Sequence, residues 1–419
     1  MKCVKKVRTM KIDSSADYEL VFLPLHRLID SSWGGEFVMP LNLGLSLTSV
    51  GVRFTAFCGT VDTFSKLALE ERGNTVIQLM QEDRYLLHNK RSMLRDIEFY
   101  WKLFNASSKI TDRNTIVHHA FPLGYRSGFN PAFLRGIKNP KVIGPLLFQP
   151  NAGIEDEEAV DQGILPIVSK NKRKTILPYL YDKTLLESDI IIFDSAKTRL
   201  QLYATNPEIQ DKEFFIMPSP GLEIQGKSQD SNRLYNRGDK LRAGIITHLR
   251  PRKRVDTVLR ALKLADSSFL ELDIYGDGPS KSYLEKLCTD LDLKNVHFRG
   301  SFPNYRLNEI IDSLDLILHL DIVPHLVNPS TNESLAHGIP VIFSEEEKIE
   351  KYIEYSYGWQ VNADDPQILA DLIDYLSSHS IEIRQKSINA LKYAEQNISH
   401  EAVGSALSDA YSKLAELVH

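Results

Sequence analysis

The sequence predicts an α/β protein of two domains, each built on a parallel β-sheet, and three observations lead to this expectation. The chain has 419 residues, more than one hydrophobic core usually supports, so about two domains of roughly 200 residues each are expected. Apolar residues make up 42% and charged residues 25%, with a net charge of −5; this balance excludes disordered and collagen-like proteins. Short β-rich runs alternate with longer helical patterns, as in parallel sheets with crossover helices.

The first half of the chain contains five short apolar runs that we expect to be strands. A helix is expected over Phe37 to Val50, because apolar residues recur there at helical spacing and Gly51 follows, as at many helix ends. The five expected strands are Leu20–Leu23, Arg53–Phe57, Thr115–His118, Val142–Ile143 and Ile190–Phe193.

The second half repeats this plan after a polar segment, Met217 to Lys240, that contains prolines and glycines. We therefore place an N-terminal domain at 1–220 and a C-terminal domain at 221–398. The segment 399–419 is expected to form an amphipathic helix that crosses back toward the N-terminal domain. The expected strands of the second half are Ala243–Thr247, Leu270–Tyr275, Val296–Phe298, Leu316–Leu318 and Val341–Phe343.

The cysteine pattern and the apolar windows bear on the compartment. Cys3, Cys58 and Cys288 lie far apart, which favours neither a disulfide framework nor a zinc site and indicates a reducing compartment. No export signal is visible, and no apolar window approaches the roughly 18 to 20 residues that cross a bilayer. We expect a cytoplasmic protein. The basic run at 170–174 follows an acidic one at 155–161; it is either a solvated loop or a surface for an anionic acceptor or the inner membrane surface.

Gly34 and Gly35 stand between the first expected strand and its helix. Backbone amides there can approach a phosphate closely, because no Cβ is in the way. A tight strand-to-helix turn explains the pair equally well. The G-x-G-x-x-G fingerprint and its acidic ribose contact are absent at this turn, which disfavours an NAD-linked dehydrogenase.

Four motifs follow one another in the second half: 247–256 (THLRPRKRVD), 274–279 (IYGDGP), 296–300 (VHFRG) and 332–342 (NESLAHGIPVI). Their order and spacing resemble the family 4 retaining glycosyltransferases, the glycosyl transferases group 1. In the first half, Gly34-Gly35, Val117-His118-His119 and Gly144-Pro145 are also similar to this family. The resemblance implies the GT-B fold, an α/β architecture of two Rossmann-like domains that face each other across a cleft.

The resemblance implies a donor site in the second half. Lys253 matches the family's phosphate lysine, whose charge would stabilise the leaving diphosphate; its alternative is an exposed basic turn. Gly276 and Gly278 match the turn that borders the nucleotide base, or are glycines that permit positive φ. Glu333 matches the second acid of E-x7-E, which contacts the ribose, and is followed by Ser334 and Leu335. Its alternative is a capping box that begins at Ser330.

Two residues depart from the family pattern. The first acid of E-x7-E is replaced by His325, and the arginine five residues before the phosphate lysine is replaced by His248. Arg250 or Arg252 could take the place of that arginine. A histidine can hydrogen-bond a sugar hydroxyl or, when protonated, face a phosphate. These changes leave the fold argument intact and leave activity open.

Histidines of the first half complete the candidate site. His118 and His119 follow a strand on the side from which sugar and acceptor would approach, and either orients one of them or is an ordinary core histidine. With His325 they form the candidate catalytic set. The D-x-D sequence at Asp290 and Asp292 falls at an expected helix end, so no metal is expected at the site.

The expected function is retaining transfer of a sugar from a UDP- or GDP-sugar to a hydroxyl acceptor, a glycan, lipid-linked molecule or protein, in glycan, glycolipid or polysaccharide synthesis. No cofactor and no nucleic-acid partner are expected. The alternative is a catalytically silent glycosyltransferase-like subunit that supports an active partner. A nucleotide-sugar epimerase is disfavoured because too few acidic and histidine groups fall in the right places.

Overall fold

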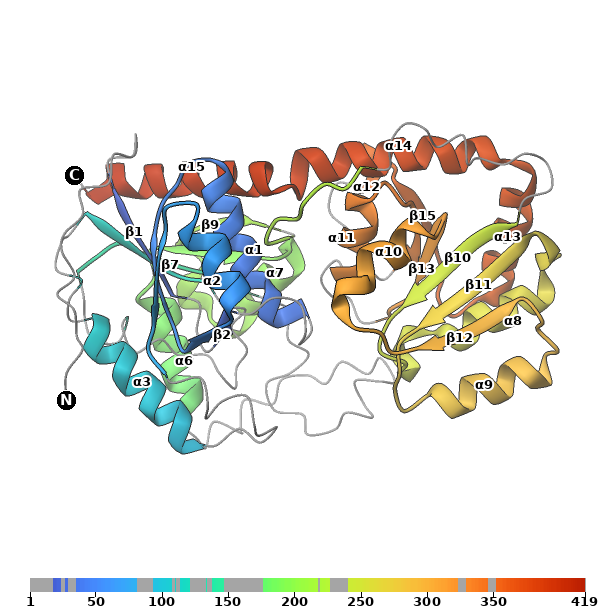
Figure 1. Ribbon diagram of the computed structural model, residues 1–419, viewed down its shortest axis with the longest axis horizontal. Coiled ribbons are helices and arrows are strands. Elements are labelled where there is room, and N and C mark those ends of the chain that lie inside the picture. Colours follow the sequence, from blue (N-terminus) through green and yellow to red (C-terminus); the bar gives the residue numbers. More distant parts are fainter. Residues whose placement is uncertain are drawn as a thin grey trace.

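The computed structural model in Figure 1 contains two large sheets, each with helices packed against it. The structure describes residues 18–23, 27–28, 35–80, 93–107, 110, 114–120, 133, 138–146, 176–217, 219–226, 240–322, 329–345 and 352–418. Strands up to residue 216 form the first large sheet, and strands from residue 241 form the second.

The first sheet has seven parallel strands in the order β5-β3-β1-β6-β7-β8-β9. Adjacent strands β1 and β6 occupy the position where the strand order reverses direction, a place where ligands bind in many open α/β sheets. The strands are β1 (Glu19–Leu23), β3 (Thr55–Cys58), β5 (Thr75–Gln78), β6 (Thr115–His119), β7 (Lys141–Leu146), β8 (Ile190–Phe193) and β9 (Glu213–Ile216); a separate small sheet pairs β2 (Arg27–Leu28) with β4 (Thr60–Val61).

Two apolar cores, one on each face, fix this sheet between its helices. Alternate residues of β1 point to opposite faces, so Phe22 joins one core and Val21 the other. Among the described residues, the helices of this half are α1 (Gly35–Ser49), α2 (Thr63–Glu70), α3 (Met93–Ser107), α6 (Ile176–Leu186) and α7 (Ala196–Thr205), and a 3-10 turn, η3, covers Pro207–Ile209.

The second sheet has six parallel strands in the order β12-β11-β10-β13-β14-β15. Its order reverses between β10 and β13, so the chain leaves these two neighbouring strands toward opposite sides of the sheet, and ligands bind at such a position in many open α/β sheets. The strands are β10 (Leu241–Ile246), β11 (Leu270–Tyr275), β12 (Val296–Gly300), β13 (Leu316–His319), β14 (Val341–Ser344) and β15 (Gly358–Val361).

The helices of the second half connect these strands in sequence. The described ones are α8 (Val255–Leu264), α9 (Lys281–Asp290), α10 (Leu307–Asp312), α11 (Pro329–Ala336), α12 (Tyr352–Tyr355), α13 (Pro366–Ser378) and α14 (Ser380–Asn397), with 3-10 turns η4 (Pro251–Lys253), η5 (Ser267–Phe269) and η6 (Asn304–Arg306). The amphipathic helix α8 buries Val255, Val258 and Leu262 in the core of this half.

The last helix, α15 (His400–Val418), continues from α14 and runs along the N-terminal half (Figure 1). Val403, Leu407, Tyr411 and Leu414 of α15 are buried in the same core as Phe22 of β1. The contact with α1 is close: a Cβ on Gly404 would lie 2.0 Å from the Ser46 carbonyl oxygen. The core on one face of the first large sheet is therefore completed by α15.

The chain passes between the two halves twice, and the described parts of these crossings lie side by side. Leu222 pairs with Ser399 in a parallel bridge, in which the Leu222 N–H donates to the Ile398 carbonyl (2.8 Å) and the His400 N–H donates to the Leu222 carbonyl (3.1 Å). Ser46 of α1 donates to the Pro220 carbonyl at 2.9 Å. One helix of the N-terminal half thus contacts both crossings.

The observed elements agree with the sequence-based expectations for all ten strands, within a few residues at their ends, and for both helices. The expected fold class is confirmed in its architecture, as two Rossmann-like α/β domains on parallel sheets. Strands β2, β4, β5, β9 and β15 were not expected from the sequence. The exact limits 1–220, 221–398 and 399–419 stay a prediction. Among the described residues, no helix combines the length and apolarity that crossing a bilayer requires.

The close approach of α15 to α1 is testable by Gly404→Ala. The added methyl group would overlap the Ser46 carbonyl oxygen, so the helices must separate, and we expect the free energy of unfolding to fall by about 1–3 kcal/mol. Urea denaturation measures this loss. Ser405→Ala on the exposed face of the same helix is the matched control and should change stability by less than about 0.5 kcal/mol. Equal effects of the two substitutions would contradict the close packing.

Candidate functional site

The loops that follow β10 and β11 are joined by backbone hydrogen bonds at the carboxyl edge of the second sheet. The Thr247 N–H donates to the Tyr275 carbonyl (3.1 Å), the Leu249 N–H to the Asp277 carbonyl (2.9 Å), and the Ser280 N–H to the Leu249 carbonyl (3.0 Å). These bonds continue the strand pairing beyond the ends of the strands. The loop that carries Lys253 therefore leaves the sheet in a fixed direction.

Glycine is required where these two loops meet. Gly276 has φ +124°, and a Cβ there would lie 1.9 Å from the Thr247 carbonyl oxygen; a Cβ on Gly278 would lie 2.3 Å from the Leu249 carbonyl oxygen. No side chain fits at such distances. The glycines thus bring the two loops together, and contact with a nucleotide base stays a prediction for them.

Lys253 ends the short η4 turn and is only 9% exposed. Its Nζ lies 2.5 Å from Asp321 Oδ2 and 3.3 Å from His319 Nε2. Arg252 Nη1 lies 3.4 Å from the same Asp321 oxygen. For Lys253 the alternative of an exposed basic turn is therefore wrong, because its ammonium group is buried at the point where the strand order reverses.

Asp321 was not identified from the sequence. It lies two residues after the end of β13 and is 2% exposed. Burial alone would raise the pKa of its carboxyl group, but the charges of Lys253 and Arg252 and the nearby His319 outweigh burial and lower that pKa. Its place after a strand, next to the strand-order reversal, is the signal that could have indicated it.

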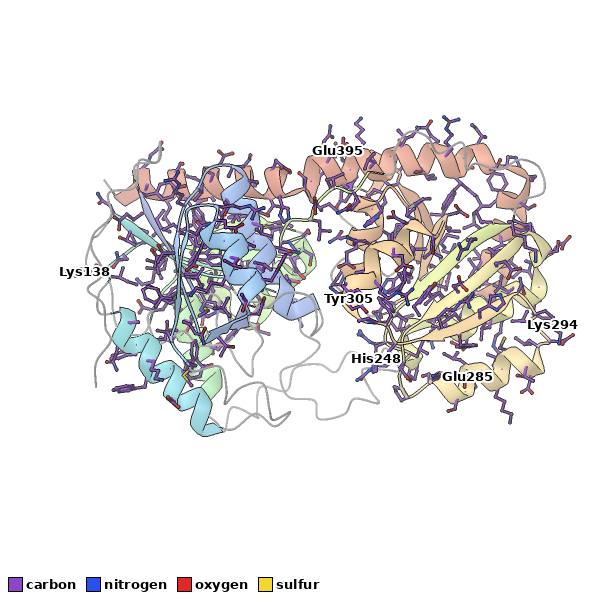
Figure 2. The ribbon with its side chains drawn as sticks, in the orientation of Figure 1. Lys138, His248, Glu285, Lys294, Tyr305 and Glu395 are labelled. Atoms are coloured by element: carbon purple, nitrogen blue, oxygen red, sulfur yellow. The ribbon has the colours of Figure 1, made fainter. Side chains whose placement is uncertain are left out.

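His248 and Arg250 belong to the same loop as Lys253. His248 is exposed, and Figure 2 shows it at the end of the second sheet that faces the N-terminal half. Arg250 is half-buried, and its carbonyl accepts a hydrogen bond from the Lys253 N–H at 3.0 Å. The Ile322 N–H donates to the Arg252 carbonyl (3.1 Å), which ties this loop to the one that follows β13.

Helix α11 presents Glu333 on the other side of the strand-order reversal. The capping-box alternative is wrong, because the helix begins at Pro329, and the Ser330 hydroxyl donates instead to the Ile246 carbonyl at the end of β10 (3.2 Å). Within the described part of the chain, the Glu333 carboxyl group makes no hydrogen bond, and burial raises its pKa to about 8. A small part of its surface remains accessible. At neutral pH this carboxyl is therefore mostly protonated.

The side chains of Ser334 and Leu335 are buried within the second half. The Ser334 hydroxyl donates to the Ser330 carbonyl one turn earlier (2.6 Å), and Leu335 is fully buried in an apolar cluster. Their side chains serve the packing of α11, and a donor contact stays a prediction for these two residues.

His118, at the end of β6, has the environment of a core histidine. Its side chain is fully buried, Nδ1 lies 2.6 Å from the Tyr411 hydroxyl, and Nε2 lies 3.1 Å from the Gly144 carbonyl oxygen. Because a carbonyl only accepts, Nε2 carries the proton and Nδ1 accepts from Tyr411. Burial lowers the pKa of His118 to about 3, so the ring is neutral. The structure gives it no access to a sugar, contrary to the catalytic role expected for it.

Of the remaining residues that the sequence indicated, the structure describes His119 and Gly35. His119 is fully buried and packs edge-on against Phe133 on the other face of the sheet, with ring centroids 6.2 Å apart; this is again a core environment. Gly35 is the first residue of α1. Gly34, His325 and the basic run at 170–174 lie outside the described residues.

The candidate metal sequence lies where it was expected, at the end of α9. Asp292 pairs there with Lys294. Across the described ranges, no group of three or more His, Cys, Asp or Glu side chains is arranged to hold a metal ion.

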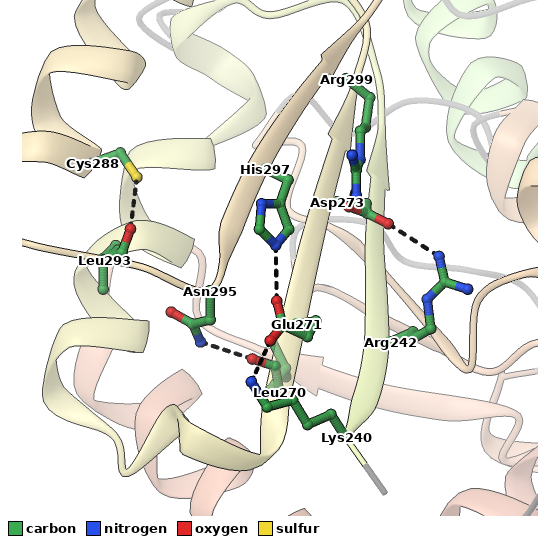
Figure 3. A network of polar contacts seen from close by, with 10 residues as sticks. All are labelled: Lys240, Arg242, Leu270, Glu271, Asp273, Cys288, Leu293, Asn295, His297 and Arg299. Carbon is green, nitrogen blue, oxygen red and sulfur yellow. Dashed lines mark hydrogen bonds and ion pairs between the residues drawn. The ribbon is translucent and has the colours of Figure 1, made fainter.

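A second set of charges lies on strands β10, β11 and β12 (Figure 3). Asp273 accepts from Arg299 Nε (2.8 Å) and lies 3.4 Å from Arg242 Nη2. Glu271 pairs with Lys240 and with His297 Nε2, the latter at 2.8 Å. Because each carboxylate has two basic neighbours within the sheet, this network is accounted for as cross-strand stabilisation.

The protein is therefore an α/β protein with a buried lysine, Lys253, at the carboxyl edge of its second sheet, where the strand order reverses. Residues 227–394 match the family model described as glycosyl transferases group 1. The segment that holds Lys253 and Glu333 therefore matches the glycosyl transferases group 1, which confirms the resemblance seen in the sequence. No curated protein matches the chain significantly.

Solved structures extend the similarity to nearly the whole chain. HepE of Anabaena, in complex with UDP, has a TM-score of 0.64 at 14% identity and covers 94% of this chain and 100% of its own. Sucrose-phosphate synthase of Thermosynechococcus elongatus has a TM-score of 0.65 at 15% identity, with 96% and 100% covered. A glycosyltransferase of Rickettsia africae has a TM-score of 0.65 at 12% identity, with 94% and 98% covered. At these identities the likeness establishes the fold.

The raised pKa of Glu333 predicts how stability depends on pH. The folded-state pKa of about 8 exceeds the unfolded value of about 4.3, so the stability present at low pH is lost as the pH rises through this interval. Glu333→Gln removes this loss and should be more stable than the wild type by roughly 4 to 5 kcal/mol at pH 8, and by about 1 kcal/mol at pH 5. Urea denaturation at both pH values measures the difference. Glu309→Gln, at a fully exposed acid, is the control, and a Glu333→Gln difference that does not change with pH would contradict the assignment.

Proposed function

We propose that this chain is a retaining glycosyltransferase that moves a sugar from a nucleotide-diphosphate donor, a UDP- or GDP-sugar, to a hydroxyl acceptor. The observation that carries the proposal is the buried ammonium group of Lys253 at the strand-order reversal of a glycosyl transferases group 1 domain. The same edge of a parallel sheet is where ligands of this kind of fold bind.

The diphosphate is the part of the donor that the site would hold most firmly. Negative charge accumulates on its oxygens as the glycosidic bond breaks, and a fixed cation lowers the energy of that state. Helix α8 begins at Val255, two residues after Lys253, so its N-terminal amide groups add a positive dipole end near the lysine. Arg250 and His248, on the same loop, are further candidates for phosphate contacts.

The nucleoside would lie between the loops after β10 and β11 on one side and α11 on the other. A protonated Glu333 both donates and accepts a hydrogen bond, which suits a ribose hydroxyl group. Gly276 and Gly278 lie on the loop after β11, and contact with the base is proposed for their backbone, since neither has a side chain.

The sugar and the acceptor would face the N-terminal half. In transfer of this type, the leaving phosphate itself accepts the acceptor proton, so the chain needs no carboxylate as general base. His325 and the Gly34-Gly35 pair are the candidates for orienting the sugar; His118 and His119 are not, because their rings are buried. We expect no metal and no other cofactor.

The choice of UDP over GDP as the first donor to test comes from a structural neighbour. HepE of Anabaena has been solved with UDP and with UDP-glucose. A glycan, lipid-linked or protein hydroxyl is the proposed acceptor. The proposed location is the cytoplasm, with contact to the inner membrane surface if the acceptor is lipid-linked.

A second candidate function is a silent subunit that supports an active partner. It is favoured by the replacement of the first acid by His325 and by the carboxylate of Asp321, which already neutralises Lys253. Donor hydrolysis or transfer by the purified chain distinguishes the two functions, because a silent subunit turns over no donor.

Removing the lysine tests the proposal directly. Lys253→Ala should weaken binding of UDP by about 10- to 100-fold, since a charge-assisted contact to phosphate is lost. Isothermal titration calorimetry measures the dissociation constant. Lys294→Ala is the matched control: Lys294 is 84% exposed and lies at the far end of the second sheet (Figure 2). Equal affinity of wild type and Lys253→Ala would remove Lys253 from the site.

A further inference from the structure

An acid occupies the place beside Lys253 where an anionic ligand would be expected. The side chain of Asp321 is almost fully buried, and its Oδ2 lies 2.5 Å from Lys253 Nζ. A contact this close between an ammonium group and a carboxylate is a charge-assisted hydrogen bond. Oδ2 also lies 3.4 Å from Arg252 Nη1. One carboxylate oxygen thus faces two cations, as a phosphate oxygen would.

The surroundings hold this carboxylate in place. Asp321 is followed by Ile322, whose N–H donates to the Arg252 carbonyl at 3.1 Å. His319, at the end of the same strand, places Nε2 3.3 Å from Lys253 Nζ. The loop after β13 therefore contacts the η4 turn through its backbone and through two side chains, so the ion pair is a built part of the site.

The pair has an electrostatic consequence for an incoming anion. A buried ammonium group without a counter-ion is unfavourable, so Asp321 keeps Lys253 charged when no ligand is bound. The same carboxylate repels a diphosphate that approaches the lysine. A diphosphate therefore gains less binding free energy from Lys253 than it would from a lysine that is surrounded by water and has no carboxylate partner.

We infer that Asp321 is a built-in competitor of the donor diphosphate, which must displace this carboxylate from Lys253 to bind. The inference rests on the proposed function and adds a residue that sets donor affinity. Lys253 thus has a different anionic partner in each state. Asp321 stabilises its charge when the site is empty, and the diphosphate replaces Asp321 when the donor is bound. Asp321 acts through Lys253 and is a positioning residue.

The decisive variant is Asp321→Asn, which keeps the shape of the side chain and removes its charge. We expect UDP to bind this variant about tenfold more tightly than the wild type, the scale of one charge-assisted contact. Inorganic pyrophosphate should show the same gain, since the effect concerns the diphosphate. Asp292→Asn is the matched control: it makes the same change in net charge at an exposed acid that pairs with Lys294, and it should leave affinity unchanged.

Lys253 provides the second arm of the test. In a Lys253→Ala background, Asp321→Asn should no longer tighten binding, because the ammonium group for which the carboxylate and the diphosphate compete is absent. The four proteins form a double-mutant cycle. A merely structural role of Asp321 predicts the opposite sign, since a loosened site binds more weakly. Thermal unfolding checks that each variant is folded, and Asp321→Ser, which keeps a hydroxyl acceptor for Lys253, replaces the asparagine variant if that one does not fold.

The outcomes separate the inference from the function. If wild type binds UDP and Asp321→Asn binds it equally or more weakly, the inference is overturned and the proposed function stands. If the gain persists without Lys253, Asp321 does not act through the lysine, which also overturns it. If the folded wild type and the folded variant bind neither UDP nor pyrophosphate, the proposed function fails, and the inference fails with it.

Discussion

The contact between Lys253 and Asp321 depends on a single topological constraint. Strands β10 and β13 are neighbours, yet the strands that follow them in sequence extend the sheet in opposite directions. Their loops therefore meet only at this edge, where the Ile322 N–H joins the Arg252 carbonyl. A lysine and an acid that are 68 residues apart are thereby held within 2.5 Å. The charge of the site therefore depends on the strand order, which brings Lys253 and Asp321 together, more than on the sequence around either residue.

The charges at this edge are balanced in an unusual way. Asp321 is kept ionised by its cationic neighbours, whereas Glu333, which has no such neighbour within the described residues, is driven toward its neutral form. Two acids close to one strand-order reversal thus have opposite tendencies, each set by its surroundings. The result is a site whose two carboxyl groups add a single negative charge at neutral pH, which is compatible with binding an anion.

The sequence indicated the architecture and the lysine, and several particular features could not be obtained from it. Apolar runs of four or five residues located the central strands, but β15 begins with Gly358, which in a sequence suggests a turn, although here its missing Cβ lets the strand approach the Val341 carbonyl oxygen. All residues of β6 are buried, whichever face of the sheet they point to. An alternation of apolar and polar residues is therefore missing, and the sequence could not show whether His118 is a core residue or a site residue. Asp321 belongs to no motif; only the strand order brings it to Lys253.

Helix α15 has a consequence for how the protein is made. The core around Phe22 includes Tyr411 and Leu414, so the half of the molecule that leaves the ribosome first stays incomplete until the last described helix has been synthesised. The second sheet needs nothing from α15 for its own core. Vectorial folding usually begins with the earlier domain; here the later domain can finish first, while the earlier one exposes the apolar surface that α15 covers in the complete fold.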